Sequence, residues 1–411
     1  MTKTDEILLA REERMMRQNR LLAENRKTLI CFTMNIPGEE KQSPLVLLAF
    51  HCGRQLLMNE LPTEPAGTFL TAAGPEAYFL CEKDPQCVKN TTCRIESSLP
   101  VGRLYDLDVF TAEGEKLSRP QRRTCFICGK PVDVCVKSGE HSVQQARDKA
   151  DEILSDFAAD YLADCAVSSL LDEVHLTPKP GLVDERNSGA HDDMDISLFE
   201  KSAVSLRDYF HSAVKIGLAE RNCMPCLQAA GLQAEKTMYA ATNGINTHKG
   251  AIYAFGLILG AMGRRLSFGD ELFSAAAQLA ENGVAISENS HGEQVRRTTA
   301  GCGARFEAES GFPHARQAYD VLCETGNSHR ALLHLMNTVQ DSNVLYRGGT
   351  EGLALVQKLA CDAMNVDDSQ LPALLDNMDA VLMKRRLSPG GCADLLALAL
   401  FLKKTDWIWN H

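Results

Sequence analysis

The chain has 411 residues and an acidic composition, with a net charge of −11 and a pI near 5.5. That balance argues against a nucleic-acid binder or a membrane-surface protein, because both usually present basic faces. No secretion signal is visible in residues 1–26, and the longest apolar run, 251–262, is too short for a bilayer crossing of about 20 residues. We therefore expect a cytoplasmic protein with neither nucleic acid nor membrane as a partner.

Residues 1–140 change their secondary-structure signal often, which is typical of an α+β fold. A charged helix is predicted over 5–24, and turns rich in glycine and proline separate the strand-like runs that follow it. The predicted strands are 29–36, 45–50, 77–81, 93–95 and 104–110.

From residue 142 onward the pattern becomes helical, and strand signals nearly vanish. The stretch 142–175 contains neither glycine nor proline, and its apolar residues recur at helical spacing. Further helices are predicted at 196–219, 224–239, 250–262, 271–281, 314–325, 328–338, 351–361, 371–387 and 393–403. We therefore expect two domains, an α+β domain over 1–150 and an all-α helical domain over 151–411.

The segment Gly102-Arg-Leu-Tyr-Asp-Leu-Asp-Val109 places two aspartates in one strand-like run. Side chains at i and i+2 share a face of a strand, so Asp106 and Asp108 can together bind one divalent cation such as Mg²⁺. Such a pair suits phosphoryl or nucleotidyl transfer, and Arg103 offers a bidentate phosphate contact that we assign to the catalytic site. The alternative is a solvent-facing strand edge with two ordinary aspartates.

Four residues of metal-binding type follow closely in the chain: Cys125, Cys128, Cys135 and His141. Their knuckle-like spacing predicts a structural Zn²⁺ site of Cys₃His type. The alternative is three reduced thiols and a surface histidine. Most of the 15 cysteines are expected to be reduced thiols, since no secretion signal accompanies them.

On these residues the N-terminal half resembles the holo-citrate lyase synthase family, also described as citrate lyase phosphoribosyl-dephospho-CoA transferase. The resemblance covers almost the whole half and includes the elements 10–14, 32–38, 73–76, Lys89 and Glu96. It implies transfer of a phosphoribosyl-dephospho-coenzyme A group to a serine of the citrate lyase acyl carrier protein, with release of pyrophosphate. It also implies that Asp106 and Asp108 hold the metal.

In the C-terminal half, two polar segments cannot be regular helix or strand: Thr177-Pro-Lys-Pro-Gly-Leu-Val-Asp184, continuing to Asp195, and 241–250. The second ends in His248-Lys249-Gly250 and runs into the apolar stretch 251–262. That layout places backbone N–H groups and basic side chains at a helix N-terminus, where anions are bound. The alternative for each charged residue is a surface charge or a capped turn.

Three further segments have the same polar, glycine-rich character: 301–307, 341–349 and 387–394. The first two contribute Arg305, Glu307, Asp341 and Arg347 as candidate site residues, whereas 387–394 is better explained as the cap of the last long helix. Polar loops of an all-α domain can converge at one end of a bundle and form a site there.

These five segments, in this order, strongly resemble the triphosphoribosyl-dephospho-CoA synthase family over about residues 160–403. The resemblance implies that ATP is joined to 3′-dephospho-coenzyme A with release of adenine. The 2′-hydroxyl of dephospho-coenzyme A would attack C1′ of the ATP ribose through an oxocarbenium-like transition state. One departure is Phe306, which stands where a glycine is usual.

We assign the predicted residues of this half by charge and by position in the five segments. Asp184 or Glu307 is the candidate catalytic carboxylate, and Asp193 or Asp341 is the candidate metal ligand. The candidate substrate-binding residues are Lys179, His191, Asn246, His248, Lys249, Arg305 and Arg347.

The two resemblances support each other, because the product of the C-terminal reaction is the substrate of the N-terminal one. We expect a bifunctional transferase that makes the citrate lyase prosthetic group and then attaches it. Its expected partners are ATP with Mg²⁺, 3′-dephospho-coenzyme A and the citrate lyase acyl carrier protein. Two alternatives are maturation of the malonate decarboxylase carrier protein and a carrier-protein-binding regulator with one decayed site.

Overall fold

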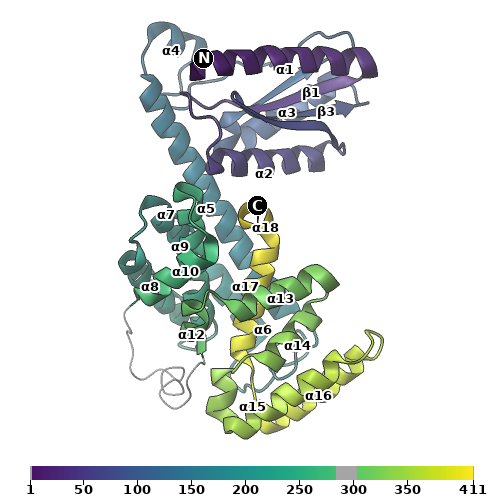
Figure 1. Ribbon diagram of the computed structural model, residues 1–411, viewed down its shortest axis with the longest axis vertical. Coiled ribbons are helices and arrows are strands. Elements are labelled where there is room, and N and C mark those ends of the chain that lie inside the picture. The colour runs from purple at the N-terminus through teal and green to yellow at the C-terminus, as the bar shows by residue number, and fades with distance from the viewer. Residues whose placement is uncertain (1, 284–302, 411) are drawn as a thin grey trace. The chain divides into compact units, whose positions relative to one another are not determined.

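The computed structural model describes residues 2–283 and 303–410 (Figure 1). The chain divides into two compact units, Met1–Ala158 and Ala159–His411. Within the described residues, no helix combines the length and the hydropathy that a bilayer crossing demands.

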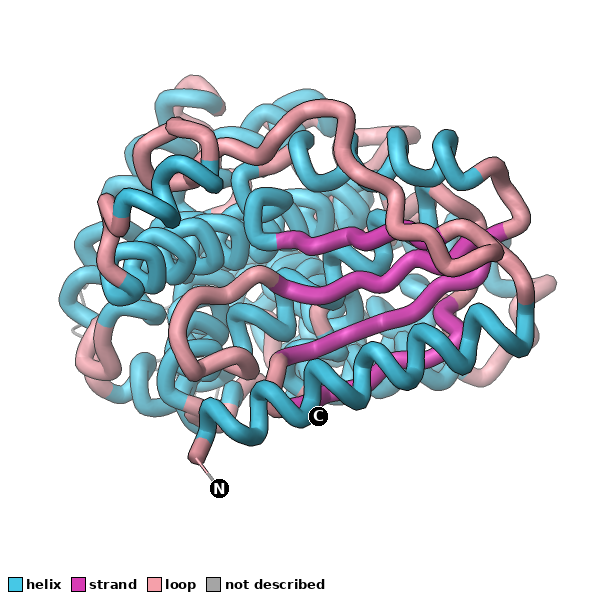
Figure 2. Tube along the Cα trace, turned by 90° about the horizontal axis from the view of Figure 1, so that it is seen from above, coloured by secondary structure: helices cyan, strands magenta, loops and turns pink. Residues whose placement is uncertain are grey.

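The N-terminal unit contains a four-stranded antiparallel sheet with the strand order β2-β3-β1-β4. The strands are β1 (Thr28–Met34), β2 (Pro65–Thr71), β3 (Gly74–Cys81) and β4 (Tyr105–Phe110). Helix α1 (Lys3–Asn25) runs along one face of the sheet, and α2 (Pro44–Glu60) and α3 (Pro85–Ser98) pack on the other (Figures 1 and 2). The remaining elements of this unit are η1 (Pro100–Leu104), α4 (Val132–Ser138) and the first part of α5 (Val143–His175).

Strand alternation sorts the side chains of the sheet onto these two faces. Ile30 and Phe32 of β1 belong to the large core under α2 and α3, whereas Leu29 and Cys31 pack with α1. This arrangement agrees with the α+β prediction for the N-terminal half.

Two predicted strands, 45–50 and 93–95, are helical, because they lie inside α2 and α3. Each helix starts with a capping residue directly before a proline: Ser43 accepts a hydrogen bond from the Val46 N–H, and Asp84 accepts one from the Cys87 N–H. A short apolar run alone does not distinguish a strand from a helix. The cap followed by proline is the signal that decides in favour of a helix here.

The C-terminal unit is mostly helical, in agreement with the prediction. Its helices after α5 are α6 (Ile196–Ser205), α7 (Arg207–Ala219), α8 (Met224–Ala241), α9 (Lys249–Phe268), α10 (Leu272–Glu281), α12 (Gly303–Glu309), α13 (Pro313–Thr325), α14 (Ser328–Thr338), α15 (Ser342–Met364), α16 (Leu371–Arg385), α17 (Gly390–Lys404) and α18 (Asp406–Trp409). Helix α15 is kinked at Gly349, which has a φ of 60°.

Helix α9 is the buried centre of this unit, with nearly every residue of its middle turns shielded from solvent. Helix α7 approaches it closely through glycines: a Cβ at Gly217 would lie 2.0 Å from the carbonyl oxygen of Gly260, so only glycine fits there. The packing of α9 brings its first turn beside the first turn of α17, since a Cβ at Gly250 would meet the Asp394 carboxylate. The two helix N-termini meet where the polar segments converge.

Candidate functional site

A cavity of about 840 Å³ lies in the C-terminal unit, and most of the predicted residues of this half line it. The predicted residues that border it are His191, Asn246, His248, Lys249, Arg305, Glu307, Asp341 and Arg347. Phe306 also borders the cavity and is 41% exposed. Gly301 and Cys302, the start of the predicted segment 301–307, lie outside the described residues.

Three cationic side chains, Lys249, Arg305 and Arg347, form what we call the basic rim of the cavity. Lys249 begins α9, and its Nζ lies 3.0 Å from Glu235 Oε2 while its side chain stays 37% exposed. Arg347 of α15 is exposed, and its guanidinium lies 3.3 Å from His191 Nδ1. Exposed cations that border one cavity can bind a polyanion at modest desolvation cost.

His248 has a different electrostatic character from the rim. Its Nδ1 lies 2.7 Å from Ser202 Oγ, and Thr247 Oγ1 donates to the same oxygen at 2.7 Å. Its Nε2 is buried and has no hydrogen-bond partner among the described residues. Burial, aided by the charge of Lys179, lowers the pKa of His248 to about 3. The ring is therefore neutral near pH 7, which revises its predicted role as a cation for phosphate.

Lys179 and Asp184 do not border the cavity in the described structure, although both are buried. The Asp184 carboxylate accepts N–H groups of Lys179, Arg186 and Asn187 at 2.8–3.1 Å, so it organises its own loop. Lys179 Nζ lies 2.6 Å from Glu173 Oε1 in a buried ion pair. The geometry thus gives these two residues structural roles in place of the predicted contacts with substrate.

Of the remaining predicted carboxylates, Glu307 and Asp341 border the cavity and Asp193 does not. Glu307 Oε2 lies 2.6 Å from His314 Nδ1, and this hydrogen bond raises the pKa of His314. Asp341 caps α15, and the Cys392 N–H donates to its Oδ2 at 3.0 Å. The Asp193 side chain is 63% exposed and does not border the cavity.

Two carboxyl groups that the sequence reasoning missed also border the cavity: Glu173 and Asp394. Asp394 lies one turn into α17 and accepts the Ala251 N–H from the first turn of α9. A Cβ at Gly250 would lie 2.0 Å from Asp394 Oδ2, so glycine makes room for this carboxyl. The α9 N-terminus was predicted to bind an anion of the substrate, and part of that position is taken by Asp394.

In the N-terminal unit, the polar residues gather on the α1 face of the sheet. The strand register aligns two rows across β3, β1 and β4, namely Glu76, Thr33 and Asp106, and then Tyr78, Cys31 and Asp108. Asp106 and Asp108 therefore share a face, as their spacing predicts. Burial and the neighbouring charge of Asp108 raise the pKa of Asp106. A divalent cation would relieve this repulsion, so the pair fits a metal.

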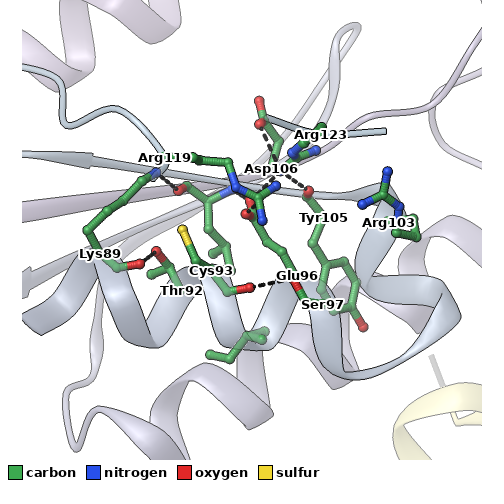
Figure 3. A network of polar contacts seen from close by, with 12 residues as sticks. Lys89, Thr92, Cys93, Glu96, Ser97, Arg103, Tyr105, Asp106, Arg119 and Arg123 are labelled. Carbon is green, nitrogen blue, oxygen red and sulfur yellow. Dashed lines mark hydrogen bonds and ion pairs between the residues drawn. The ribbon is translucent and has the colours of Figure 1, made fainter. Parts of the chain in front are cut away.

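The outer edge of β4 is capped by side chains, as Figure 3 shows. Lys89 Nζ donates to the Leu107 carbonyl at 3.2 Å, and Glu96 accepts the Leu107 N–H at 2.8 Å. Arg123 pairs with Glu96 and lies 3.5 Å from Asp106. These contacts protect an edge strand and place a cation beside the candidate metal site.

Arg103, the predicted phosphate ligand, donates to the Thr124 carbonyl. Arg123 is the arginine that the structure brings to Asp106, and the sequence reasoning missed it. Arg123 lies two residues before Cys125, and its carbonyl accepts the Val132 N–H, so the Cys/His knuckle holds its backbone in place.

The four predicted zinc ligands come together. The ligand atoms of Cys125, Cys128, Cys135 and His141 all lie within 4.8 Å of one another. His141 Nε2 is buried and has no hydrogen-bond partner among the described residues. Three sulfurs and one imidazole in this arrangement are compatible with a tetrahedral zinc site.

Comparison with known proteins identifies both halves. Residues 2–157 match the family described as apo-citrate lyase phosphoribosyl-dephospho-CoA transferase, and residues 159–411 match the ATP:dephospho-CoA triphosphoribosyl transferase family. The chain belongs to these two transferase families, fused in one polypeptide. It is therefore a transferase, and it is a member of families that act in the biosynthesis of the citrate lyase prosthetic group.

Relatives with the same two-part organisation are known. The chain is 33% identical to a protein named CitXG from Haemophilus influenzae, over 96% of this chain and 94% of that protein. It is 31% identical to a CitXG protein from Leuconostoc mesenteroides subsp. cremoris, over 97% of this chain and 96% of that protein. A 2-(5″-triphosphoribosyl)-3′-dephosphocoenzyme-A synthase from Haemophilus ducreyi is 35% identical over 67% of this chain and 98% of its own length.

Proposed function

We propose that the C-terminal unit transfers the triphosphoribosyl group of ATP to the 2′-hydroxyl of 3′-dephospho-coenzyme A and releases adenine. The N-terminal unit then transfers phosphoribosyl-dephospho-coenzyme A to a serine of the citrate lyase acyl carrier protein and releases pyrophosphate. The observation that carries the proposal is the cavity of about 840 Å³, which joins a basic rim to buried carboxyl groups. Its volume lies in the usual range for small-molecule sites, about 300–1,000 Å³.

The basic rim is the part of the cavity suited to the triphosphate. Lys249, Arg305 and Arg347 are cationic, partly exposed and adjacent to the same space. Mg²⁺ bound with ATP supplies further charge compensation for the phosphates. Glu307, held by His314, takes the proton of the attacking 2′-hydroxyl.

The α1 face of the N-terminal sheet suits the second transfer. Asp106 and Asp108 would hold Mg²⁺, and the ion would supply charge compensation for the phosphoryl group during its transfer. Arg123 lies beside Asp106 and is available to the phosphate or to the departing pyrophosphate. The citrate-specific description of the matching family favours citrate lyase over malonate decarboxylase as the system served.

Cys125, Cys128, Cys135 and His141 bind structural zinc in this proposal. Zinc would fix the knuckle that carries Arg123. Metal analysis of the purified protein should find about one zinc per chain, and Cys128→Ser should lower it. If the protein is purified from cells grown with added zinc and still contains none, the four residues do not form a zinc site.

The test of the first activity is incubation of the whole protein with ATP, Mg²⁺ and dephospho-coenzyme A, followed by chromatography for free adenine. No adenine above a protein-free control would contradict the C-terminal assignment. Adding apo carrier protein tests the second activity through a mass increase and pyrophosphate release. Modification of the malonate decarboxylase carrier protein in preference to that of citrate lyase would reverse the choice of system.

A further inference from the structure

Ribosyl transfer from ATP needs a proton for its leaving group. When the C1′–N9 bond breaks, its electron pair moves onto adenine, and departure is far easier if a ring nitrogen is protonated. Most of the sequence-predicted residues have other roles, because the basic rim serves the triphosphate and Glu307 serves the nucleophile. The Asp341 carboxyl accepts the N–H groups of Asn343, Val344 and Cys392.

The cavity is electrostatically divided, and the division orients ATP. The rim is cationic and partly exposed, whereas the residues that we call the cavity floor are the buried Glu173 and His248 and the half-buried Asp394. Among the described residues, the lysine and arginine side chains that border the cavity are Lys249, Arg305 and Arg347, so the floor offers no such cation to a triphosphate. The nucleoside end of ATP is uncharged, so the triphosphate belongs at the rim and the adenosine at the floor.

The floor also carries a free polar atom, which points to a ligand there. His248 Nε2 is buried without a partner among the described residues, and leaving a buried polar group unpaired destabilises the protein. A nucleoside hydroxyl or ring nitrogen would satisfy this atom of the neutral imidazole. This observation is independent of the charge on the rim and is compatible with a nucleoside at the floor.

Asp394 is the floor residue that holds a proton. Burial, then the charges of Glu173 and Asp341, raise the pKa of Asp394 well above its ordinary value. The N-terminus of α9, through the Ala251 N–H, favours the charged form and opposes this shift, but desolvation of the carboxyl is the larger effect. Glu173 stays the charged member of the pair because Lys179 binds it at 2.6 Å.

We propose that Asp394 is the general acid that protonates adenine as it leaves C1′, an inference that rests on the function proposed above. The C1′–N9 bond breaks toward adenine, and the Asp394 carboxyl gives its proton to a ring nitrogen and becomes a carboxylate. The 2′-hydroxyl oxygen bonds to C1′, and its proton passes to Glu307. Adenine leaves neutral, and one proton returns from Glu307 to Asp394 through solvent to close the cycle.

The test compares two substrates in Asp394→Asn, which keeps the shape of the side chain. ATP needs the acid, whereas 7-methyl-ATP carries a cationic base that leaves as neutral 7-methyladenine without a proton. With ATP we expect kcat to fall about 10²- to 10⁴-fold, and with 7-methyl-ATP we expect a loss below about 10-fold. Asp172→Asn, an exposed aspartate paired with Lys404, is the matched control and should behave like the parent.

Equal losses on both substrates, or no loss on ATP, would overturn the role of Asp394. The pH dependence of kcat with ATP gives a second measurement if 7-methyl-ATP is a poor substrate for the parent. The fall of kcat at high pH should vanish in Asp394→Asn. If this fall persists in the variant, Asp394 is not the general acid. Absence of adenine release by the parent protein would instead contradict the proposed function, so the two failures are distinguishable.

Discussion

Glu76 and Glu96 of the N-terminal unit differ from Asp394 and Asp341 of the C-terminal unit in what surrounds their carboxylates. Glu76 is fully buried and pairs with Arg14 and Arg17 of α1, and Glu96 pairs with two arginines in the same way. Asp394 forms no ion pair among the described residues, and its charged neighbours are acidic. A buried carboxyl group without a cation keeps its proton.

This difference separates ion-paired carboxylates, which stabilise the fold, from carboxyl groups without a cationic partner, which can donate a proton. The arginine partners keep Glu76 and Glu96 in place and balance their charge. The C-terminal cavity leaves a protonated acid and a neutral histidine facing open space.

Lys179→Ala should destabilise the C-terminal unit by about 3–5 kcal/mol, because it leaves Glu173 as an uncompensated buried charge. Denaturant unfolding measures the change. The double variant Glu173→Gln/Lys179→Met removes both charges and should recover much of the lost stability. If the Lys179→Ala protein is stable but its KM for ATP is raised, Lys179 binds the triphosphate, as the sequence predicts.

The second prediction separates the two activities within one chain. Asp106→Asn removes half of a metal site worth several kcal/mol, so attachment to the carrier protein should slow by roughly 100-fold or more. Adenine release should not change. Glu113→Gln, an exposed carboxylate on the following loop, is the control and should leave both activities intact. Unchanged attachment by Asp106→Asn would remove the aspartate pair from the site.

The sequence was a better guide to the N-terminal site than to the C-terminal one, and the reason is geometric. Asp106 and Asp108 lie in one strand, where a spacing of two fixes a common face. The C-terminal cavity is assembled by loops and helix ends distant in the chain, so spacing says nothing of which side chain faces inward. Asp184 was predicted to face the substrate, but its carboxylate accepts N–H groups of its own loop. Asp394 belongs to a segment that was predicted to cap a helix, but it borders the cavity.

Similar limits explain the missed helices and the missed arginine. The run 45–50 has the same composition as a buried strand, and only Ser43 and Pro44 in front of it indicate a helix. Arg123 reaches Asp106 from a different segment, and no local pattern joins the two. Tertiary packing decides such contacts.

Lys249→Ala tests the basic rim and should weaken ATP binding with little effect on stability. Loss of one charged hydrogen bond is worth about 1.5–3 kcal/mol, which corresponds to a KM increase of roughly 10- to 100-fold. Lys236→Ala on α8 is exposed, does not border the cavity and is the matched control. Steady-state adenine release against ATP concentration gives the comparison. An unchanged KM would exclude Lys249 from the triphosphate site.

The Glu307–His314 hydrogen bond should make a small, pH-dependent contribution to the free energy of unfolding. This hydrogen bond raises the pKa of His314 above its ordinary 6.5, so its stabilisation is complete below pH 6.5 and is lost as pH rises through the raised pKa. The difference in unfolding free energy between the parent and His314→Gln should therefore shrink between pH 6 and 8, by less than about 1 kcal/mol for a partly exposed pair. The nearby His334 gives the contrast, because burial lowers its pKa, and the difference for His334→Gln should change with the opposite sign. A difference for His314→Gln that stays constant with pH would mean that Glu307 is not bound to a protonated imidazole.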